Sequence, residues 1–222
     1  MAEMSAGQPS AVTEAEEEAL FYHETTLNAA WTGSRLALGA LTFGFGAFIF
    51  AYFYLRSLNT HGMWHPAGFK DPQPWAGAVV MALIVVSAAG QTLVLQRIKR
   101  GHKGAWLAGA MVAIVLGLGA IGLQVWQLLN LPFFPGSAGY ASVFTGATPV
   151  FVAVVFCAMI WLEILIAKAR RIPAIFFIEQ PPTYAEAFRV QRFQASLSAF
   201  TLVWNYLAVV AVVFWALFYL AV

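Results

Sequence analysis

The stretch YASVFTGATPVFVAVVFCAMIWLEILIA, residues 140–167, carries a single charged side chain, that of Glu163. An apolar run of about 18 or more residues is typical of a helix that crosses a membrane. Hydrocarbon offers no partner to backbone N–H and C=O groups, so the segment has to satisfy them internally. Four comparable runs occur elsewhere in the chain, and the sequence therefore predicts five transmembrane helices.

The composition excludes a water-soluble domain. Of the 222 residues, 61% are hydrophobic and 10% are charged, whereas a soluble domain carries about 25% charged residues. The mean hydropathy is +0.74. We expect an all-α, polytopic membrane protein, and neither the composition nor the net charge of +2 indicates nucleic-acid binding.

The chain divides into an acidic head and an apolar domain. Residues 1–30 read as a soluble extension, in which Thr13 and Glu16 fit a capping box that starts a surface helix. Residues 31–222 read as one five-helix domain. The expected spans are 35–55, 75–96, 105–129, 148–167 and 197–222.

The placement of lysine and arginine predicts the orientation. Loops 97–104 and 168–196 are basic, whereas loop 130–147 has no lysine or arginine and loop 56–74 has only Arg56 and Lys70. Because basic loops stay in the cytoplasm, we expect a cytoplasmic N-terminus and a C-terminus outside. In the second basic loop, Thr183 and Glu186 are expected to cap a short helix that lies along the membrane or on a neighbour.

Few side chains in the spans can perform chemistry. Glu163 is the one carboxylate within an apolar run. One interpretation is a proton site or an ion pair with a partner subunit. The favoured one is an interfacial carboxylate that reaches water or pairs with Lys168 or Arg170.

Residues that could bind a metal are equally scarce in the expected spans. No histidine lies in an expected span, so we expect this chain to bind no haem and no catalytic metal itself. His61 and His65 in the first loop leave a surface copper or zinc site open, but turn or interface roles are favoured. Cys157, the single cysteine, is expected to pack as a small hydrophobic residue.

The remaining polar residues in or near the spans are amides. They can hydrogen-bond across helices or line a quinone site, and the first role is favoured. Glycines in the first three spans are expected to let helices approach closely. These observations predict a packing subunit of a larger membrane complex. The amides are Gln91, Gln124, Gln127 and Asn130.

The order of several motifs resembles subunit III of haem-copper oxidases, in its short five-helix form. FGFGAFIFAYFY at 43–54 leads to a loop with Trp64, Pro66 and Gly68, as in the family. Leu116–Gly117 and Leu123–Gln124 reproduce the family's LG and LQ pairs, and WNYLAVV at 204–210 is similar to its last span. The residues that fit its Y-x-S-x-F-x-x-A-T pattern are Tyr140, Ser142, Phe144, Ala147 and Thr148.

Several polar residues of that family are absent. A family glutamate corresponds to Leu41, two histidines to Phe151 and Val154, and a His and an Asp to Asn205 and Ala208. A proton-relay role is therefore not expected. We interpret Ser142, Thr145 and Thr148 as caps of the fourth helix, with Pro149 in its first turn. Trp64, Gln124, Tyr140 and Glu163 are expected to be structural or interface residues.

The resemblance implies a non-catalytic accessory subunit of a respiratory terminal oxidase in aerobic electron transport. Its partner would be the catalytic subunit I, which holds haem and copper and belongs to a proton-translocating cytochrome c or quinol oxidase. The expected location is the cytoplasmic membrane of a prokaryote. The expected roles are to stabilise the catalytic subunit, hold phospholipid and offer oxygen an apolar route.

Arg35 and Arg56 are expected to meet lipid phosphates, although ordinary snorkelling explains them equally well. Three alternatives to the accessory role remain: a companion subunit of a nitric oxide reductase, a small transporter, and, least favoured, a free-standing membrane enzyme.

Overall fold

The computed structural model describes residues 14–59, 62–179 and 181–221, and within these ranges every regular element is helical. A one-turn 3₁₀ helix, Ala174–Phe177, precedes α5, and a π-helical turn, Ala216–Leu220, ends it. The five long helices are α1 (Glu14–Ser57), α2 (Pro74–Lys99), α3 (Lys103–Leu129), α4 (Gly139–Arg170) and α5 (Tyr184–Trp215).

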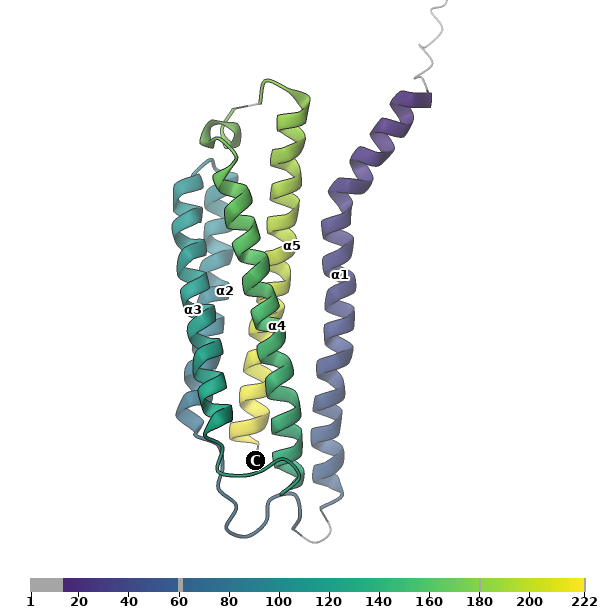
Figure 1. The fold of residues 1–222 in the computed structure, drawn as a ribbon. Coiled ribbons are helices and arrows are strands. Elements are labelled where there is room, and N and C mark those ends of the chain that lie inside the picture. The colour runs from purple at the N-terminus through teal and green to yellow at the C-terminus, as the bar shows by residue number, and fades with distance from the viewer. Residues whose placement is uncertain (1–13, 60–61, 180, 222) are drawn as a thin grey trace, which may run out of the picture.

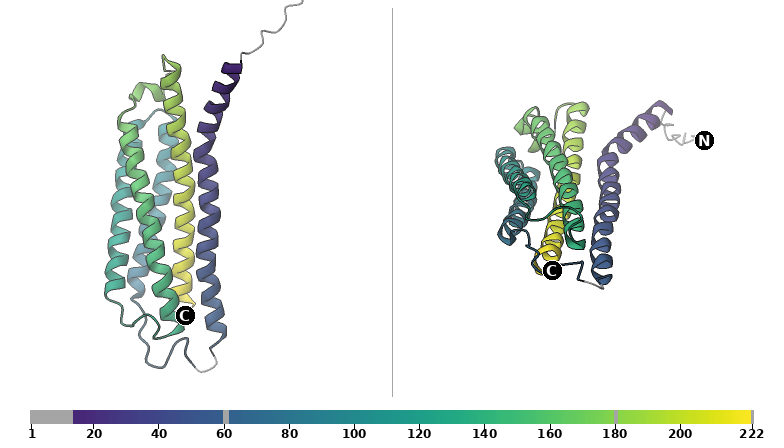
Figure 2. Two further views of the ribbon diagram at one scale, coloured as in Figure 1. Left: turned by 45° about the vertical axis from the view of Figure 1, so that its right-hand side comes forward. Right: turned by 60° about the horizontal axis from the view of Figure 1, so that its bottom comes forward.

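Four of the helices form a closed ring, and the fifth packs on its outside. Helix α2 contacts α3, α3 contacts α4, α4 contacts α5, and α5 contacts α2. Helix α1 lies against α4 and α5, and its N-terminal part leans away from the ring (Figure 1). The two further views in Figure 2 show the same arrangement.

The two ends of the bundle differ in charge. We call the end with loops 100–102 and 171–183 the basic end. The opposite end holds loops 58–73 and 130–138 and the last turn of α5, and we call it the C-terminal end (Figure 1). The basic end carries Arg97, Lys99, Arg100, Lys103, Lys168, Arg170, Arg171, Arg189 and Arg192.

All five helices are long and apolar enough to cross a membrane. The chain is a multi-pass membrane protein, as its composition predicts. The spans are longer than expected: Thr25–Ser57, Pro74–Lys99, Lys103–Leu129, Gly139–Arg170 and Tyr184–Leu220.

Two helix starts differ from the expected ones. The segment 184–188 is not a separate surface helix but the first turn of α5. Its predicted cap is present, because the Glu186 N–H donates to Thr183 Oγ1 at 3.4 Å. At the other end of the chain, one helix runs from Glu14 through the first span, and the expected capping residue Thr13 lies outside the described residues.

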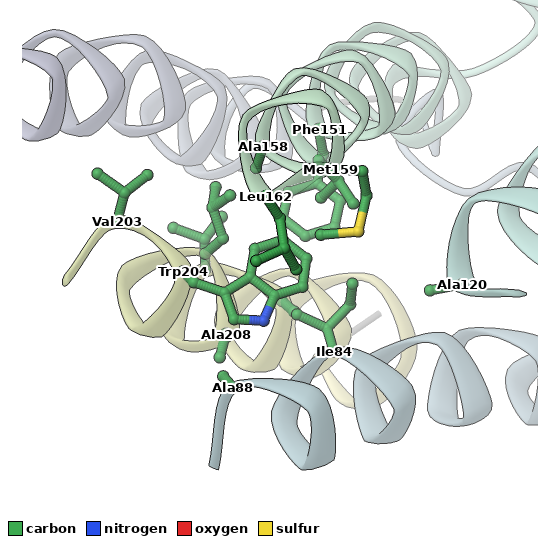
Figure 3. Packing of buried hydrophobic residues seen from close by; sticks show 14 of the residues in the cluster. Ile84, Ala88, Ala120, Phe151, Ala158, Met159, Leu162, Val203, Trp204 and Ala208 are labelled. Atoms are coloured by element: carbon green, nitrogen blue, oxygen red, sulfur yellow. The ribbon is translucent and has the colours of Figure 1, made fainter. Parts of the chain in front are cut away.

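Trp204 of α5 occupies the centre of the ring. Its side chain is fully buried between Ile84 and Ala88 of α2 and Leu162 of α4 (Figure 3). Its indole N–H donates to Ser87 Oγ at 3.1 Å. The Ser87 hydroxyl in turn donates to the Ala113 carbonyl of α3 at 3.3 Å, so one polar chain ties α5 to α2 and α3.

Glycine permits close helix contact at some positions only. A Cβ atom on Gly109 of α3 would lie 2.5 Å from Cγ1 of Val94 on α2, which is closer than real contacts allow. A Cβ atom on Gly117 would lie 2.3 Å from Met159 Sδ of α4. A Cβ atom on Gly122 would meet nothing within 4 Å. Gly109 and Gly117 therefore serve packing, as predicted. The prediction does not hold for Gly39, Gly44 and Gly46 of the first span or for Gly90 and Gly122, where a Cβ atom would meet nothing within 4 Å.

We predict that Gly109→Ala destabilises the protein by about 1–3 kcal/mol, because the new methyl group overpacks against a stiff β-branched side chain. Gly122→Ala on the same helix should be neutral or should stabilise by up to about 1 kcal/mol through helix propensity. Thermal unfolding in detergent, followed by circular dichroism, measures both. Equal melting temperatures for the two variants would contradict the close α2–α3 contact.

Candidate functional site

Tyr140 lies at the centre of an aromatic cluster at the C-terminal end. Its side chain is fully buried, and the surrounding rings come from loop 58–73, loop 130–138, α4 and α5. Their centroids lie 5.9–6.2 Å from the Tyr140 centroid. These rings belong to Trp64, Phe69, Phe133, Phe144 and Phe218.

Two tyrosines cap the end of α5. The Tyr140 hydroxyl donates to the Phe218 carbonyl at 2.8 Å, and the Tyr52 hydroxyl donates to the Ala221 carbonyl at 2.8 Å. Arg56 also donates to the Ala221 carbonyl. The last carbonyls of a helix lack intrahelical partners, so side chains from α1 and α4 satisfy these two and fix the end of α5.

Loop 58–73 in turn supports the start of α4. The N–H groups of Gly139 and Tyr140 donate to the carbonyls of Met63 and Trp64 at 3.1 and 3.3 Å. Trp64 is itself held by Asn59, whose side-chain oxygen accepts from the Trp64 N–H at 3.0 Å. The first N–H groups of a helix are unpaired within it, and the loop carbonyls satisfy two of them.

The interpretation of the α4 hydroxyls as helix caps is wrong. Helix α4 begins at Gly139, and its N-cap is Ala138, which makes no side-chain cap. Ser142 and Thr145 donate to the carbonyls four residues earlier at 3.0 and 2.7 Å. Such back-bonding lets hydroxyl residues sit inside a helix. Thr148 is buried and Pro149 lies within the helix rather than in its first turn.

A string of amide hydrogen bonds lies beside the aromatic cluster. Gln124 Nε2 donates to Gln127 Oε1 at 2.9 Å, and Gln127 Nε2 donates to the Gln73 carbonyl at 3.0 Å. The Tyr219 hydroxyl also donates to Gln127 Oε1, at 3.0 Å. Gln127 therefore joins α3 to the start of α2 and the end of α5, as the sequence predicts for an interhelical amide.

Two small apolar cavities border this string, with volumes of about 30 and 10 Å³. Val80, Gln124 and Phe151 line both. This space suits a water-sized or diatomic molecule and is far smaller than a quinone ring or a haem. The amides of Gln124 and Gln127 already bond to protein, so the packing role of these side chains is the better supported one.

The structure also contains an interhelical pair and a buried unpaired amide that the sequence did not indicate. Asn205 Nδ2 of α5 donates to Thr92 Oγ1 of α2 at 3.0 Å, although Thr92 carried no signal in the sequence. Gln91 is fully buried, yet neither of its amide atoms has a hydrogen-bond partner. Asn130 bonds within its own helix, to the Trp126 carbonyl.

The charged candidates lie on the surface of the bundle. The Arg35 guanidinium lies 4.2 Å from the Trp31 ring centroid, and that of Arg56 lies 6.0 Å from the Tyr52 centroid. Both side chains are exposed, and their binding of lipid phosphate stays a prediction. Glu163 is exposed on α4.

The candidate metal ligands are dispersed. His65 Nε2 lies 2.7 Å from Asp71 Oδ1, and His61 falls outside the described residues. In the part of the chain that the structure describes, no three His, Cys, Asp or Glu residues are grouped to hold a metal. Cys157 was expected to be packed, but it is exposed on α4. An outward face of a membrane helix is as apolar as its core, so sequence alone does not distinguish the two.

Comparison of the chain with protein-family models and with curated proteins finds no match.

We predict opposite effects of the same substitution at two buried glutamines. Gln127→Leu leaves the Gln73 carbonyl and the Tyr219 hydroxyl unpaired and should destabilise the protein by about 1–3 kcal/mol. Gln91→Leu removes an amide that has no partner and should stabilise it by a similar amount. Thermal unfolding in detergent measures both. A loss of stability in Gln91→Leu equal to that in Gln127→Leu would contradict the unpaired state of Gln91.

We also predict that Tyr140→Phe lowers the free energy of unfolding by about 1 kcal/mol, because the buried Phe218 carbonyl loses its donor while the ring remains. Tyr54→Phe is the matched control, since the Tyr54 side chain is 52% exposed. Thermal unfolding compares the two variants. Indistinguishable melting temperatures would show that the hydroxyl does not stabilise the end of α5.

Proposed function

We propose that this chain is a non-catalytic accessory subunit of a respiratory haem-copper terminal oxidase, similar to subunit III in its short form. The observation that supports this most is the position of the residues that carry the resemblance. Trp64, Tyr140 and Phe144 belong to one aromatic cluster at the C-terminal end, and Thr148 and Gln124 line the adjoining cavity. Residues scattered over the sequence thus form one structural unit.

The polar groups of the spans support a role in assembly rather than catalysis. The Tyr140 hydroxyl and the amides of Gln124 and Gln127 bond to protein backbone or to each other. None of the five spans contains a histidine, which is the residue that haem and copper centres most need. We therefore assign haem and copper to partner subunits and propose that this chain braces the catalytic subunit I.

Two further roles fit the structure, one for the apolar interior and one for the outer surface. The cavities beside Gln124 are small and lined mainly by apolar side chains, which suits passage of a diatomic gas such as oxygen. The exposed Arg35 and Arg56, each beside an aromatic ring, suit a phospholipid whose phosphate meets the guanidinium. In this proposal the protein lies in the cytoplasmic membrane of a prokaryote, with the basic end in the cytoplasm.

Purification through a tag on this chain in mild detergent tests the proposal. We predict that mass spectrometry identifies haem-copper oxidase subunits in the product and that a reduced-minus-oxidised spectrum shows haem bands. A multi-pass protein of unrelated function with the same tag, purified from the same cells, is the control.

A colourless product without oxidase subunits would refute the proposal and make transport the next function to test. Co-purified nitric oxide reductase subunits would assign the chain to that enzyme instead. The identity of the subunits recovered would also indicate the electron donor.

A further inference from the structure

The larger of the two cavities beside Gln124 has polar groups in an otherwise apolar wall. We call it the Thr148 cavity. Its volume is about 30 Å³, and side chains of α2, α3, α4 and the end of α5 line it. Three of the lining residues, Gln124, Thr148 and Trp215, carry a polar group that the protein itself leaves unpaired. The smaller cavity, of about 10 Å³, has Gln124 as its one polar lining residue.

The hydroxyl of Thr148 makes no hydrogen bond within the described part of the chain. This is unusual for a threonine in these helices. Thr92, Thr145 and Thr201 donate to the carbonyls four residues earlier, at 3.0, 2.7 and 2.9 Å. The Phe144 carbonyl, which is the corresponding acceptor for Thr148, receives no such bond. The Thr148 side chain is only 6% exposed, so its hydroxyl requires a partner inside the bundle.

Gln124 uses only one side of its amide. Its Nε2 donates to Gln127 Oε1 at 2.9 Å, whereas its Oε1 accepts no hydrogen bond from any described residue. The side chain is 6% exposed. Trp215 adds an indole nitrogen that is buried without a partner. Because burial of an unpaired polar group costs free energy, three such groups around one cavity indicate a shared ligand.

The three groups match the hydrogen-bonding capacity of water. The Gln124 carbonyl oxygen accepts, the Trp215 indole donates, and the Thr148 hydroxyl does either. A buried water needs a cavity of about 10–15 Å³ or more and two to four polar partners. The Thr148 cavity meets both conditions, whereas the smaller cavity offers one polar side chain and little volume. A diatomic gas in the Thr148 cavity would leave the three groups without a strong hydrogen bond.

We propose that the Thr148 cavity binds an ordered water molecule, which donates to Gln124 Oε1 and also bonds to the Thr148 hydroxyl and the Trp215 indole. The water thereby links α3, α4 and α5 inside the ring. This inference does not depend on the proposed function, and an oxygen molecule that passed through this cavity would have to displace the water.

A structure of the full-length chain at a resolution that shows ordered water tests the proposal directly. Cryo-electron microscopy of the chain with a bound antibody fragment is suited to this. We expect one compact density peak at about 2.7–3.2 Å from Gln124 Oε1 and from Thr148 Oγ1. Thr148→Val, which keeps the shape and removes the hydroxyl, should lose the peak. Thr148→Ser, which keeps the hydroxyl, should retain it.

Thermal unfolding in detergent is a second test, because the two states of the hydroxyl predict opposite signs. If water pairs the hydroxyl, Thr148→Val should lower the melting temperature by about 2–4 °C. If the hydroxyl is unpaired, the same substitution should raise it. Thr201→Val is the matched control, since Thr201 is 5% exposed and its hydroxyl bonds within its own helix. Its melting temperature should stay within about 1 °C of the wild-type value.

Each other outcome overturns the water proposal. A cavity without density, or with the elongated density of a detergent or lipid chain, shows that water is not its ligand. A peak that Thr148→Val leaves unchanged removes the role of the hydroxyl. A melting temperature of Thr148→Val at or above the wild-type value shows that the hydroxyl has no partner there. An equal fall in Thr201→Val shows that the loss does not come from the cavity.

Discussion

A polar group inside a membrane has to find its partner within protein, and the end of α5 shows how much depends on this. The Phe218 and Ala221 carbonyls accept hydrogen bonds from Tyr140 and Tyr52, which belong to α4 and α1. Tyr140 is in turn held by the loop that ends at α2, because its N–H donates to the Trp64 carbonyl. The bonds that cap α5 therefore also fix the positions of α1, of α4 and of loop 58–73, which lies against the start of α4. Burial makes the Tyr140 bond matter most, since the Phe218 carbonyl would have no solvent partner without it.

The same constraint explains why few polar side chains in the ring of helices are free to take part in chemistry. The Trp204 indole, the Ser87 hydroxyl and the Ala113 carbonyl form one chain across three helices, and Asn205 pairs with Thr92. These side chains act as links between helices. Such links between helices make the bundle rigid, which suits a protein that binds a neighbouring subunit. Glu163 is the opposite case, because its side chain is exposed on the outer surface of α4.

Much of the fold could be predicted because hydrocarbon demands long uninterrupted apolar helices, and such runs are visible in sequence. The five spans were found, and the Thr183–Glu186 cap of α5 was identified from local sequence alone. The start of α4 was placed nine residues late, at Thr148 instead of Gly139. Hydroxyls and Pro149 are typical of a helix start, but here Ser142 and Thr145 bond to carbonyls inside the helix, and the helix is started by carbonyls from a distant loop.

The sequence by itself determined that the chain is helical, that it has five spans, and that one end of the bundle is basic, because these properties follow from hydropathy and from charge along the chain. Tertiary structure alone decided which polar side chains meet. Gln127 and Gln91 are indistinguishable as amides within apolar runs, yet one joins three elements and the other has no partner. It also decided that Cys157 and Glu163 face outward while Tyr140 is buried. The physical reason is that a membrane helix is apolar on all sides, so hydropathy does not mark its inner face, and only packing against its neighbours selects that face.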